Sequence, residues 1–74
     1  MNVGELGNRL KEERASRGLS QADLGELVHV SRKTINTVEN GVFIPSTVLA
    51  LRLARALDTT VERLFFLHDD RRRR

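Results

Sequence analysis

The chain has 74 residues, no cysteine, and 13 lysine and arginine residues against 10 aspartate and glutamate residues, for a net charge of +3. This length allows one small domain, which has neither disulfides nor a thiolate zinc site to stabilise it. No apolar run reaches the roughly 18 residues that a membrane span needs, and no signal peptide opens the chain, so we expect a cytoplasmic protein. The net charge is weak evidence for nucleic-acid binding, because four arginines, Arg71–Arg74, end the chain and residues 1–70 hold nine basic and ten acidic residues.

The first helix is predicted over residues 3–17, with Gly18 as its stop. Its apolar stripe consists of Val3, Leu6 and Leu10. Continuing this stripe by four residues reaches Arg14, and an unpaired guanidinium on the core-facing side would be costly. We therefore expect Arg14 to form a structural ion pair with Glu39, near the end of the third helix.

A pair of helices is predicted next, over residues 20–41. Ser20 is a favourable N-cap, and Asp23 can return the hydrogen bond as in a capping box. Ser31 caps the following helix, and Gly41 stands where a left-handed residue is expected to end it. The residues expected to face the core are Leu24, Leu27, Val28, Ile35 and Val38. Two helices joined by three or four residues cross steeply, which is the helix-turn-helix geometry.

The turn between these helices needs one residue with positive φ, and His29 is the best placed. Histidine adopts this conformation more often than most non-glycine residues, at a cost on the order of 1 kcal/mol. A metal site would need more ligands than His29 and His68, the two histidines of the chain. A catalytic role would need a nucleophile or a paired carboxylate within reach. We predict a turn residue, with no metal site and no catalytic site.

The outer face of the helix after this turn is polar and carries no acid. Its residues are Arg32, Lys33, Asn36, Thr37 and Asn40. Arginine can pair with guanine edges, asparagine with adenine, and threonine can offer its methyl group to thymine. The alternative is an ordinary solvated face, but such faces usually include acidic residues for pairing at i,i+4. Directly behind a helix-turn-helix turn, the pattern favours a surface that binds double-stranded DNA.

Two further helices complete the prediction. Ser46 caps a fourth helix over residues 47–57, and Thr59 with Glu62 forms a capping box for a short fifth helix over residues 60–67. The residues expected to face inward are Ala50, Leu53, Ala54, Leu57, Val61, Leu64 and Phe65. The fold class is therefore all-α, a five-helix bundle with no strand.

The last two helices carry more apolar residues than one small core can hold. The unplaced residues are Val48, Leu49, Leu51, Phe66 and Leu67. Exposed hydrophobic residues are ordinary singly, but several together form a patch, and a patch usually marks an interface. We expect a homodimer there, with Val48, Leu49, Phe66 and Leu67 as candidate interface residues. Residues 1–68 then form the binding domain, and residues 69–74 a charged, disordered tail.

From about Leu6 to Leu67 the chain resembles the helix-turn-helix regulators of the phage repressor and Cro type, often called the Xre family. That resemblance implies a five-helix bundle of the lambda-repressor-like type. The residues that carry it are Asn8-Arg9-Leu10, Arg14, Gly18-Leu19-Ser20-Gln21, Leu24, Val30-Ser31, Ile35, Glu39-Asn40-Gly41, Pro45-Ser46 and Leu53-Ala54-Arg55-Ala56-Leu57.

The resemblance also implies roles for individual residues. Arg32, Lys33 and Thr37 match positions that contact base edges, and Asn36, on the same exposed face, is expected to contact bases with them. Gln21 and Asn40 match positions that contact DNA phosphates, and Ser31 is a further candidate for a phosphate contact. Gln21 further resembles a residue that braces the recognition helix, and Arg14 with Glu39 resembles a buried ion pair of the family.

Two residues depart from the family pattern. Gly25 stands where alanine is usual, and His29 where glycine is usual. Gly25 should weaken the second helix by up to about 1 kcal/mol while allowing a close helix approach, and His29 should strain the turn. Neither departure removes a predicted DNA contact.

The function predicted from these observations is a sequence-specific, double-stranded DNA-binding transcription regulator that acts as a homodimer. Its recognition helix, about residues 32–40, would enter the major groove. No cofactor, small-molecule ligand or membrane is expected. An enzyme is not expected, because the sequence has no paired carboxylates, nucleophile–base arrangement or glycine-rich phosphate loop. The alternative, from another class, is an antitoxin or adaptor module that binds a partner protein through the fourth and fifth helices.

Overall fold

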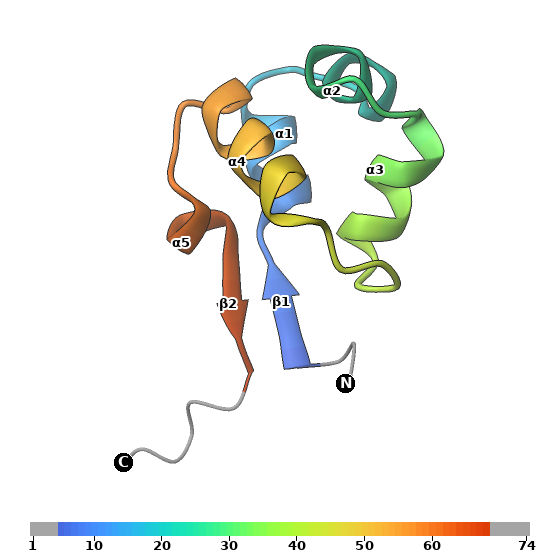
Figure 1. Ribbon diagram of the computed structural model, residues 1–74. Helices are drawn as coiled ribbons and strands as arrows, with labels where there is room; N and C mark the ends of the chain where they lie inside the picture. The colour runs from blue at the N-terminus through green and yellow to red at the C-terminus, as the bar shows by residue number, and fades with distance from the viewer. Residues whose placement is uncertain (1–4, 69–74) are drawn as a thin grey trace.

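The computed structural model of the protein describes residues 5–68 (Figure 1). Its elements, in chain order, are β1 (Leu6–Asn8), α1 (Leu10–Ser16), α2 (Gln21–Val28), α3 (Arg32–Glu39), α4 (Thr47–Ala56), α5 (Val61–Leu64) and β2 (Phe65–Leu67). The five predicted helices are confirmed. Val3, and the tail predicted over residues 69–74, lie outside the described residues.

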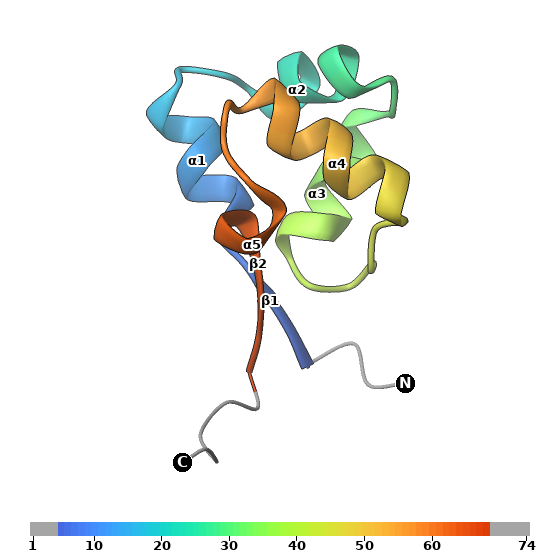
Figure 2. The ribbon, with the colours of Figure 1, turned by 60° about the vertical axis from the view of Figure 1, so that its left-hand side comes forward.

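The helices gather around one core, and the two strands extend from it side by side (Figures 1 and 2). Helix α2 packs against both α3 and α4, and α3 also contacts α1. The buried hydrophobic residues are Leu10, Leu24, Val28, Ile35, Val38, Leu49, Leu53, Ala54, Leu57, Leu64 and Phe65. They come from every helix, so the core holds the helix pair α2–α3 in place. No helix within residues 5–68 is long and apolar enough to cross a membrane.

The prediction that the chain has no strand was wrong. Strands β1 and β2 pair antiparallel, with Leu6 opposite Leu67 and Gly7 opposite Phe66. This sheet takes the place of the first turns predicted for α1 and the last turn predicted for α5, so α1 begins at Leu10 and α5 ends at Leu64. Strands of three residues have too few positions to show a period of two, so the sequence pattern carried no signal for them.

The sheet depends on a glycine facing an aromatic ring. A Cβ atom built on Gly7 would clash with the ring of Phe66 and the imidazole of His68, so a larger residue there would force these two side chains to move. The guanidinium of Arg9 lies over the same ring, 4.6 Å from its centroid, and the imidazole of His68 meets it edge-on at 5.4 Å. Phe66 is therefore half-buried within its own chain.

Side-chain caps begin four of the five helices. The predicted capping box is confirmed: Ser20 Oγ accepts from the backbone N–H of Asp23 at 2.9 Å, and Asp23 accepts from that of Ser20 at 3.0 Å. Ser31 and Ser46 cap α3 and α4 as predicted. The predicted box of Thr59 with Glu62 was wrong. The cap of α5 is the following residue, Thr60, whose hydroxyl accepts from the N–H of Arg63.

Positive φ angles mark the ends of helices. Gly18 (φ 70°) and Gly41 (φ 74°) take this conformation at the two predicted stops. His29 has φ 66° and ψ 41°, so the prediction that it forms the strained turn is confirmed. Asp58, with φ 54°, takes the same conformation between α4 and α5, which the sequence analysis did not anticipate.

Two predictions about the core were wrong. Leu27 is 55% exposed, because the packing of α2 against α3 and α4 buries Leu24 and Val28 and leaves Leu27 on the outer side of the helix. Leu49 is only 7% exposed and packs in the core, so its side chain is not available to a partner. The inward stripe of α4 runs through Leu49, Leu53 and Leu57, four residues apart, and the predicted stripe began one residue too late. The remaining apolar residues predicted to face inward are buried or half-buried.

Candidate nucleic-acid interface

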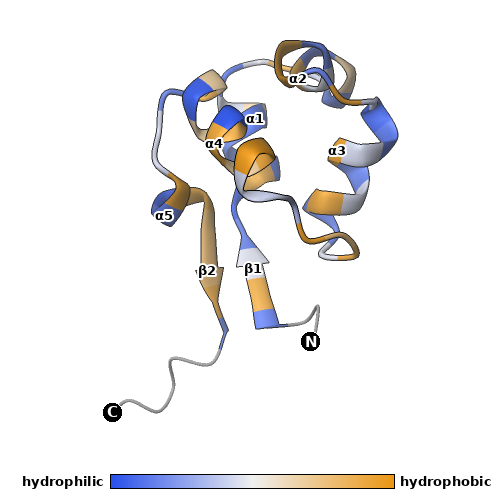
Figure 3. Cartoon of the chain, in the orientation of Figure 1, coloured by the Kyte–Doolittle hydropathy of each residue, from blue (hydrophilic) through white to orange (hydrophobic). Residues whose placement is uncertain are grey.

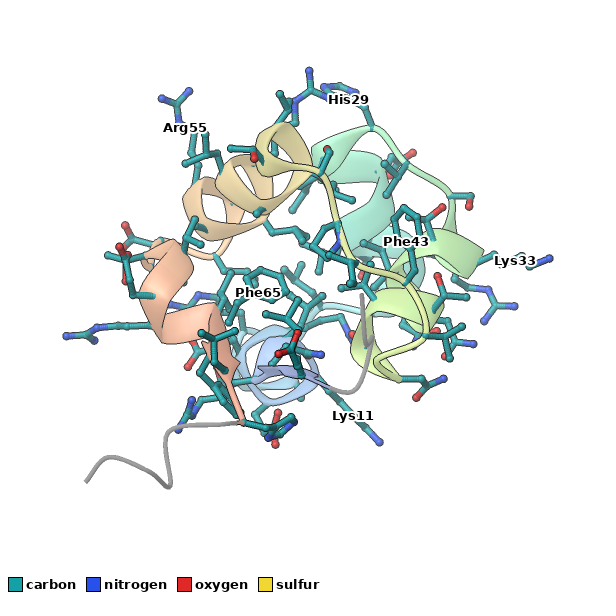
Figure 4. All side chains as sticks on the ribbon, turned by 60° about the horizontal axis from the view of Figure 1, so that its bottom comes forward. Lys11, His29, Lys33, Phe43, Arg55 and Phe65 are labelled. Atoms are coloured by element: carbon teal, nitrogen blue, oxygen red, sulfur yellow. The ribbon has the colours of Figure 1, made fainter. Side chains whose placement is uncertain are left out.

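The outward face of α3 presents cations and amides. Arg32 and Lys33, in its first turn, are exposed, and Figure 4 shows Lys33 reaching away from the body of the protein. Asn40, at its end, is also exposed. Asn36 and Thr37 are half-buried, and Thr37 Oγ1 donates to the carbonyl oxygen of Thr34 at 2.9 Å. The face is therefore open to a ligand at its start and more tightly packed in its middle.

The only acid of α3, Glu39, points inward. Its side chain is 3% exposed, and Arg14 Nε donates to its Oε2 at 2.6 Å. Arg14 also donates through Nη2 to Glu39 Oε1 at 3.2 Å and through Nη1 to the carbonyl oxygen of Leu19. The hydrogen bond with Glu39 and the charge of its carboxylate hold the pKa of Arg14 above its usual value. The predicted ion pair is confirmed, and it leaves the outer face of α3 with positive charge only.

Gln21, the first residue of α2, connects this ion pair to the outer face. Its Nε2 donates to Glu39 Oε1 at 3.0 Å and to Asn36 Oδ1 at 3.3 Å. Its Oε1 accepts from Arg32 Nη1 at 3.5 Å, at the limit of a hydrogen bond. The predicted bracing of α3 by Gln21 is confirmed. Because both N–H groups of its amide already have acceptors, a phosphate contact would require one of these bonds to exchange.

The other two predicted phosphate contacts lie at the ends of α3. Ser31 Oγ accepts from the backbone N–H of Thr34 at 3.1 Å and lies 3.1 Å from the Thr34 hydroxyl. Asn40 Nδ2 donates to Asn36 Oδ1 at 3.1 Å, which occupies one of its two N–H groups. Both side chains are exposed, and their contacts with phosphate remain predictions.

Asn8 is a positioning residue that the sequence analysis did not identify. Its Nδ2 donates to the backbone carbonyl oxygen of Val38 in the last turn of α3, at 3.0 Å, and its Oδ1 accepts from the N–H of Leu10. Asn8 thus hydrogen-bonds a backbone carbonyl group at the end of α3 and a backbone N–H group at the start of α1. An asparagine two residues before an apolar helix start is a recognisable capping signal, but the longer predicted helix concealed it.

A second open surface lies between α4 and α5, and it is a groove. Its apolar lining includes Val48, Leu51 and Val61. Charged residues of both signs line it as well, namely Arg52, Arg55, Asp58 and Glu62. Of the four candidate interface residues, only Val48 lines this groove. Leu67 is exposed elsewhere, on β2.

The apolar colouring in Figure 3 extends into the loop after α3, where Val42 and Phe43 are exposed. Backbone N–H groups of both residues donate to the carbonyl oxygen of Thr37, so the loop is tied to α3. Within residues 5–68, no three His, Cys, Asp or Glu side chains come together as a metal site would require.

Comparison with known proteins gives the same family from sequence and structure. A family model described as a helix-turn-helix domain matches residues 5–65. YgzD of Bacillus subtilis, an uncharacterised HTH-type transcriptional regulator, is 41% identical over 65 residues, which cover 88% of this chain and 98% of that protein. An uncharacterised HTH-type transcriptional regulator of Methanocaldococcus jannaschii is 40% identical with the same coverage.

Two solved structures share the fold. The restriction-modification controller protein C.AhdI from Aeromonas hydrophila is 40% identical, with a TM-score of 0.70 over 74% of this chain and 80% of that chain. The P22 c2 repressor, solved in complex with a synthetic operator, is 29% identical, with a TM-score of 0.71 over 84% of this chain and 89% of that chain. This chain therefore belongs to the helix-turn-helix domain family, in its phage repressor and Cro branch.

Proposed function

We propose that this protein is a sequence-specific transcription regulator that binds double-stranded DNA through α3. The observation that carries the proposal is the charge on this helix: Arg32 and Lys33 are exposed, whereas its one carboxylate, on Glu39, is buried and neutralised by Arg14. A DNA phosphate approaching α3 therefore meets no exposed acid on that helix. The relatives named as HTH-type transcriptional regulators, and the P22 repressor bound to its operator, support the same conclusion.

The dimensions of α3 suit the major groove. An α-helix with its side chains is about 10–12 Å in diameter, and the major groove of B-form DNA is about 12 Å wide. In this arrangement Arg32, Lys33, Asn36 and Thr37 contact base edges. Gln21, Ser31 and Asn40 lie toward the phosphates, where contacts fix the position of the protein without reading sequence. We propose that residues 1–68 act as the binding domain and that the protein is cytoplasmic, where it reaches DNA. The proposed function needs no cofactor and no catalytic group.

We further propose that two copies associate through the groove between α4 and α5. A two-fold dimer places the same surface on both partners, so the surface must complement itself. This groove meets that requirement, because its apolar residues Val48 and Leu51 adjoin two arginines and two acids. The arginines of one copy can face the acids of the other. Such a dimer would read two half-sites about 34–36 Å apart.

Selection from a random double-stranded DNA library, followed by sequencing, tests the proposal directly. Arg32→Ala or Lys33→Ala should cost about 1–3 kcal/mol on the selected site and relax the base preference at one position. Arg63→Ala is the matched control, because it removes the same charge from an exposed position on α5. It should leave the selected site unchanged. Equal losses on selected and random DNA for the α3 variants would show that these residues only grip phosphate.

The open groove also suits a second candidate function, an antitoxin or adaptor whose α4 and α5 bind a different protein. Light scattering after size-exclusion chromatography separates the two functions. A stable dimer that Val48→Asp converts to a monomer would support the regulator. A monomer that binds no DNA at low salt would favour the adaptor, and would overturn the proposed function.

A further inference from the structure

Asn36 lies in the middle of the outer face of α3, but its carbonyl oxygen is already in use. Asn36 Oδ1 accepts from Gln21 Nε2 at 3.3 Å and from Asn40 Nδ2 at 3.1 Å. A carbonyl oxygen has two lone pairs, so these two donors saturate it. Among the described residues no acceptor is recorded for Asn36 Nδ2, so its two N–H groups are the part of the amide left for a ligand.

The orientation of this amide follows from a charged group and is not arbitrary. The carboxylate of Glu39, paired with Arg14, can only accept hydrogen bonds, so Gln21 must turn its NH₂ group toward Glu39. The same nitrogen of Gln21 also donates to Asn36, so Asn36 must turn its acceptor, Oδ1, toward Gln21. The carboxylate of Glu39 thus fixes the orientation of the Gln21 amide, and Gln21 in turn fixes the orientation of the Asn36 amide. If the Asn36 amide were flipped, its NH₂ group would face the NH₂ group of Gln21, and two donors would meet with no acceptor between them.

We infer that Asn36 is a donor-only specificity residue, and that Gln21 and Glu39 are positioning residues that act through it. This inference rests on the proposed function. A free NH₂ group recognises acceptors in the major groove, which are guanine O6 and N7, thymine O4 and adenine N7. Adenine N7 lies beside the N6 amino group, which is itself a donor, so a donor-only side chain fits adenine less well than guanine or thymine. The bidentate contact of asparagine with adenine needs a free carbonyl oxygen for the adenine N6 amino group, and here that oxygen is occupied. The sequence expectation that asparagine pairs with adenine is therefore replaced by a preference for guanine or thymine.

Asn36→Asp tests the inference most sharply, because it changes the outward chemistry and keeps the inward bonds. One carboxylate oxygen can still accept from Gln21 and Asn40, while the outward atom becomes an acceptor. In random-library selection, the wild type should enrich guanine or thymine at one base pair of each half-site. Asn36→Asp should enrich a base with an amino donor there, cytosine through N4 or adenine through N6, and should bind the wild-type site about 10- to 100-fold more weakly. Thermal unfolding followed by circular dichroism confirms that the variant is folded, and Asn36→Ala, which should accept any base at that pair, replaces it if it is not.

Gln21→Ala tests the positioning role. Without its NH₂ group the amide of Asn36 can turn, so the base preference at that one pair should relax and admit adenine. Loss of a phosphate contact or of support for the fold would lower binding to all sequences by the same factor, so the deciding readout is the base preference at that pair. A uniform loss with an unchanged base preference, or enrichment of adenine opposite Asn36 in the wild type, would overturn the inference and leave the proposed function standing.

A measurement on the free protein separates this inference from the proposed function. In ¹⁵N spectra, the side-chain NH₂ protons of Gln21 should exchange with water slowly and those of Asn36 rapidly. The reverse pattern would overturn these amide orientations whether or not DNA binds. If the wild type enriches no sequence at all, both the proposed function and the base preference at Asn36 are refuted. The exchange pattern still decides how the amides of Gln21 and Asn36 are oriented.

Discussion

The α2–α3 pair and the β1–β2 sheet are held together by different kinds of contact. In the pair, serine caps, a left-handed turn at His29 and the ion pair of Arg14 with Glu39 fix the geometry. In the sheet, two three-residue strands from opposite ends of the described chain meet, and the ring of Phe66 packs on Gly7 and Arg9. Most contacts of the pair join residues close in sequence, whereas those of the sheet join residues about sixty positions apart.

This difference shows which contacts fix the side-chain directions on the outer face of α3. The outer face of α3 is fixed by hydrogen bonds to a buried carboxylate, so its amides have defined directions. The sheet contributes packing and ties the two ends of the described chain, and Asn8 of β1 links it to α3 through a hydrogen bond to Val38. Substitutions in the two regions should therefore differ in size and in what they change.

The largest effect is expected at the ion pair. Glu39→Ala leaves the guanidinium of Arg14 without its buried partner and should lower the free energy of unfolding by about 3 kcal/mol. Urea unfolding at one fixed protein concentration measures this. Glu13→Ala is the control, because it removes a partner from the exposed pair with Arg17 and should cost less than about 1 kcal/mol. Similar losses in both variants would mean that burial of Glu39 contributes little.

The next effect concerns a glycine within α2. Alanine normally stabilises a helix relative to glycine by about 1 kcal/mol. At Gly25, however, a Cβ atom would lie 2.6 Å from the backbone carbonyl oxygen of Val30, which the turn holds in place. Gly25→Ala should therefore destabilise the protein by about 1–3 kcal/mol, measured by the same urea titration.

Gly7→Ala is the corresponding change in the sheet. Its Cβ atom would meet the side chain of Phe66 and no backbone, and a side chain can rotate away. The loss should be smaller, about 1 kcal/mol, and should come with release of the Arg9 contact on the ring. A larger loss at Gly7 than at Gly25 would reverse the ranking of the two regions.

A smaller effect of opposite sign is expected at the turn. His29→Gly removes the strain of φ 66° and should stabilise the protein by about 0.5–1 kcal/mol, after the added flexibility of the unfolded chain is subtracted. His29→Ala is the control and should give no gain, since alanine keeps the Cβ atom. Asp58→Gly, in the second left-handed position, should gain less, because aspartate tolerates this conformation better. The melting temperatures of these three variants and of the wild type, measured under the same conditions, test this ranking.

The smallest effect is a pH dependence of the α2 cap. The hydrogen bond that the backbone N–H of Ser20 donates to Asp23 lowers the pKa of that carboxyl below its usual value. A carboxyl whose pKa is lower in the folded state stabilises the fold above its unfolded pKa, about 4, and loses that effect as the pH falls through its folded pKa. The difference in melting temperature between wild type and Asp23→Ala should therefore be full at pH 7 and vanish in acid. Ser20→Ala should keep part of its deficit of about 1 kcal/mol in acid, because the Ser20 hydroxyl accepts from the N–H of Asp23 without titrating. The remainder should fade in acid, because the side chain of Ser20 also helps to lower the pKa of Asp23.

Sequence reasoning found the parts of the site that depend on residue type at short range. The caps at Ser20, Ser31 and Ser46 could be predicted because each acts on a backbone N–H three residues away. The turn at His29 could be predicted because few residues tolerate positive φ. The pairing of Arg14 with Glu39 could be predicted because helical spacing turned the arginine toward the core, where it needed a carboxylate.

The cap of α5 was misplaced by one residue, because two adjacent threonines, Thr59 and Thr60, could both cap it. The other errors occurred where a residue's environment is set by a distant segment. The sequence of Leu6–Asn8 fits the start of a helix, and only the strand at Phe65–Leu67 draws it into a sheet. Leu49 and Leu27 are both leucines on amphipathic helices, and the packing of α2 against α4 decided that one is buried and the other exposed. The local sequence pattern does not predict which of these two leucines is buried.

The sequence by itself determined the presence of five helices, the caps of α2, α3 and α4, the strained turn and the cationic outer face of α3, because these depend on backbone preferences and on charges a few residues apart. Only the tertiary structure decided the sheet, the need for glycine at Gly25, and the direction in which Asn36 presents its amide. Each of these depends on atoms that come together only when separate segments pack. For Asn36, one buried carboxylate on Glu39 orients Gln21, and Gln21 in turn orients the side chain that would meet DNA.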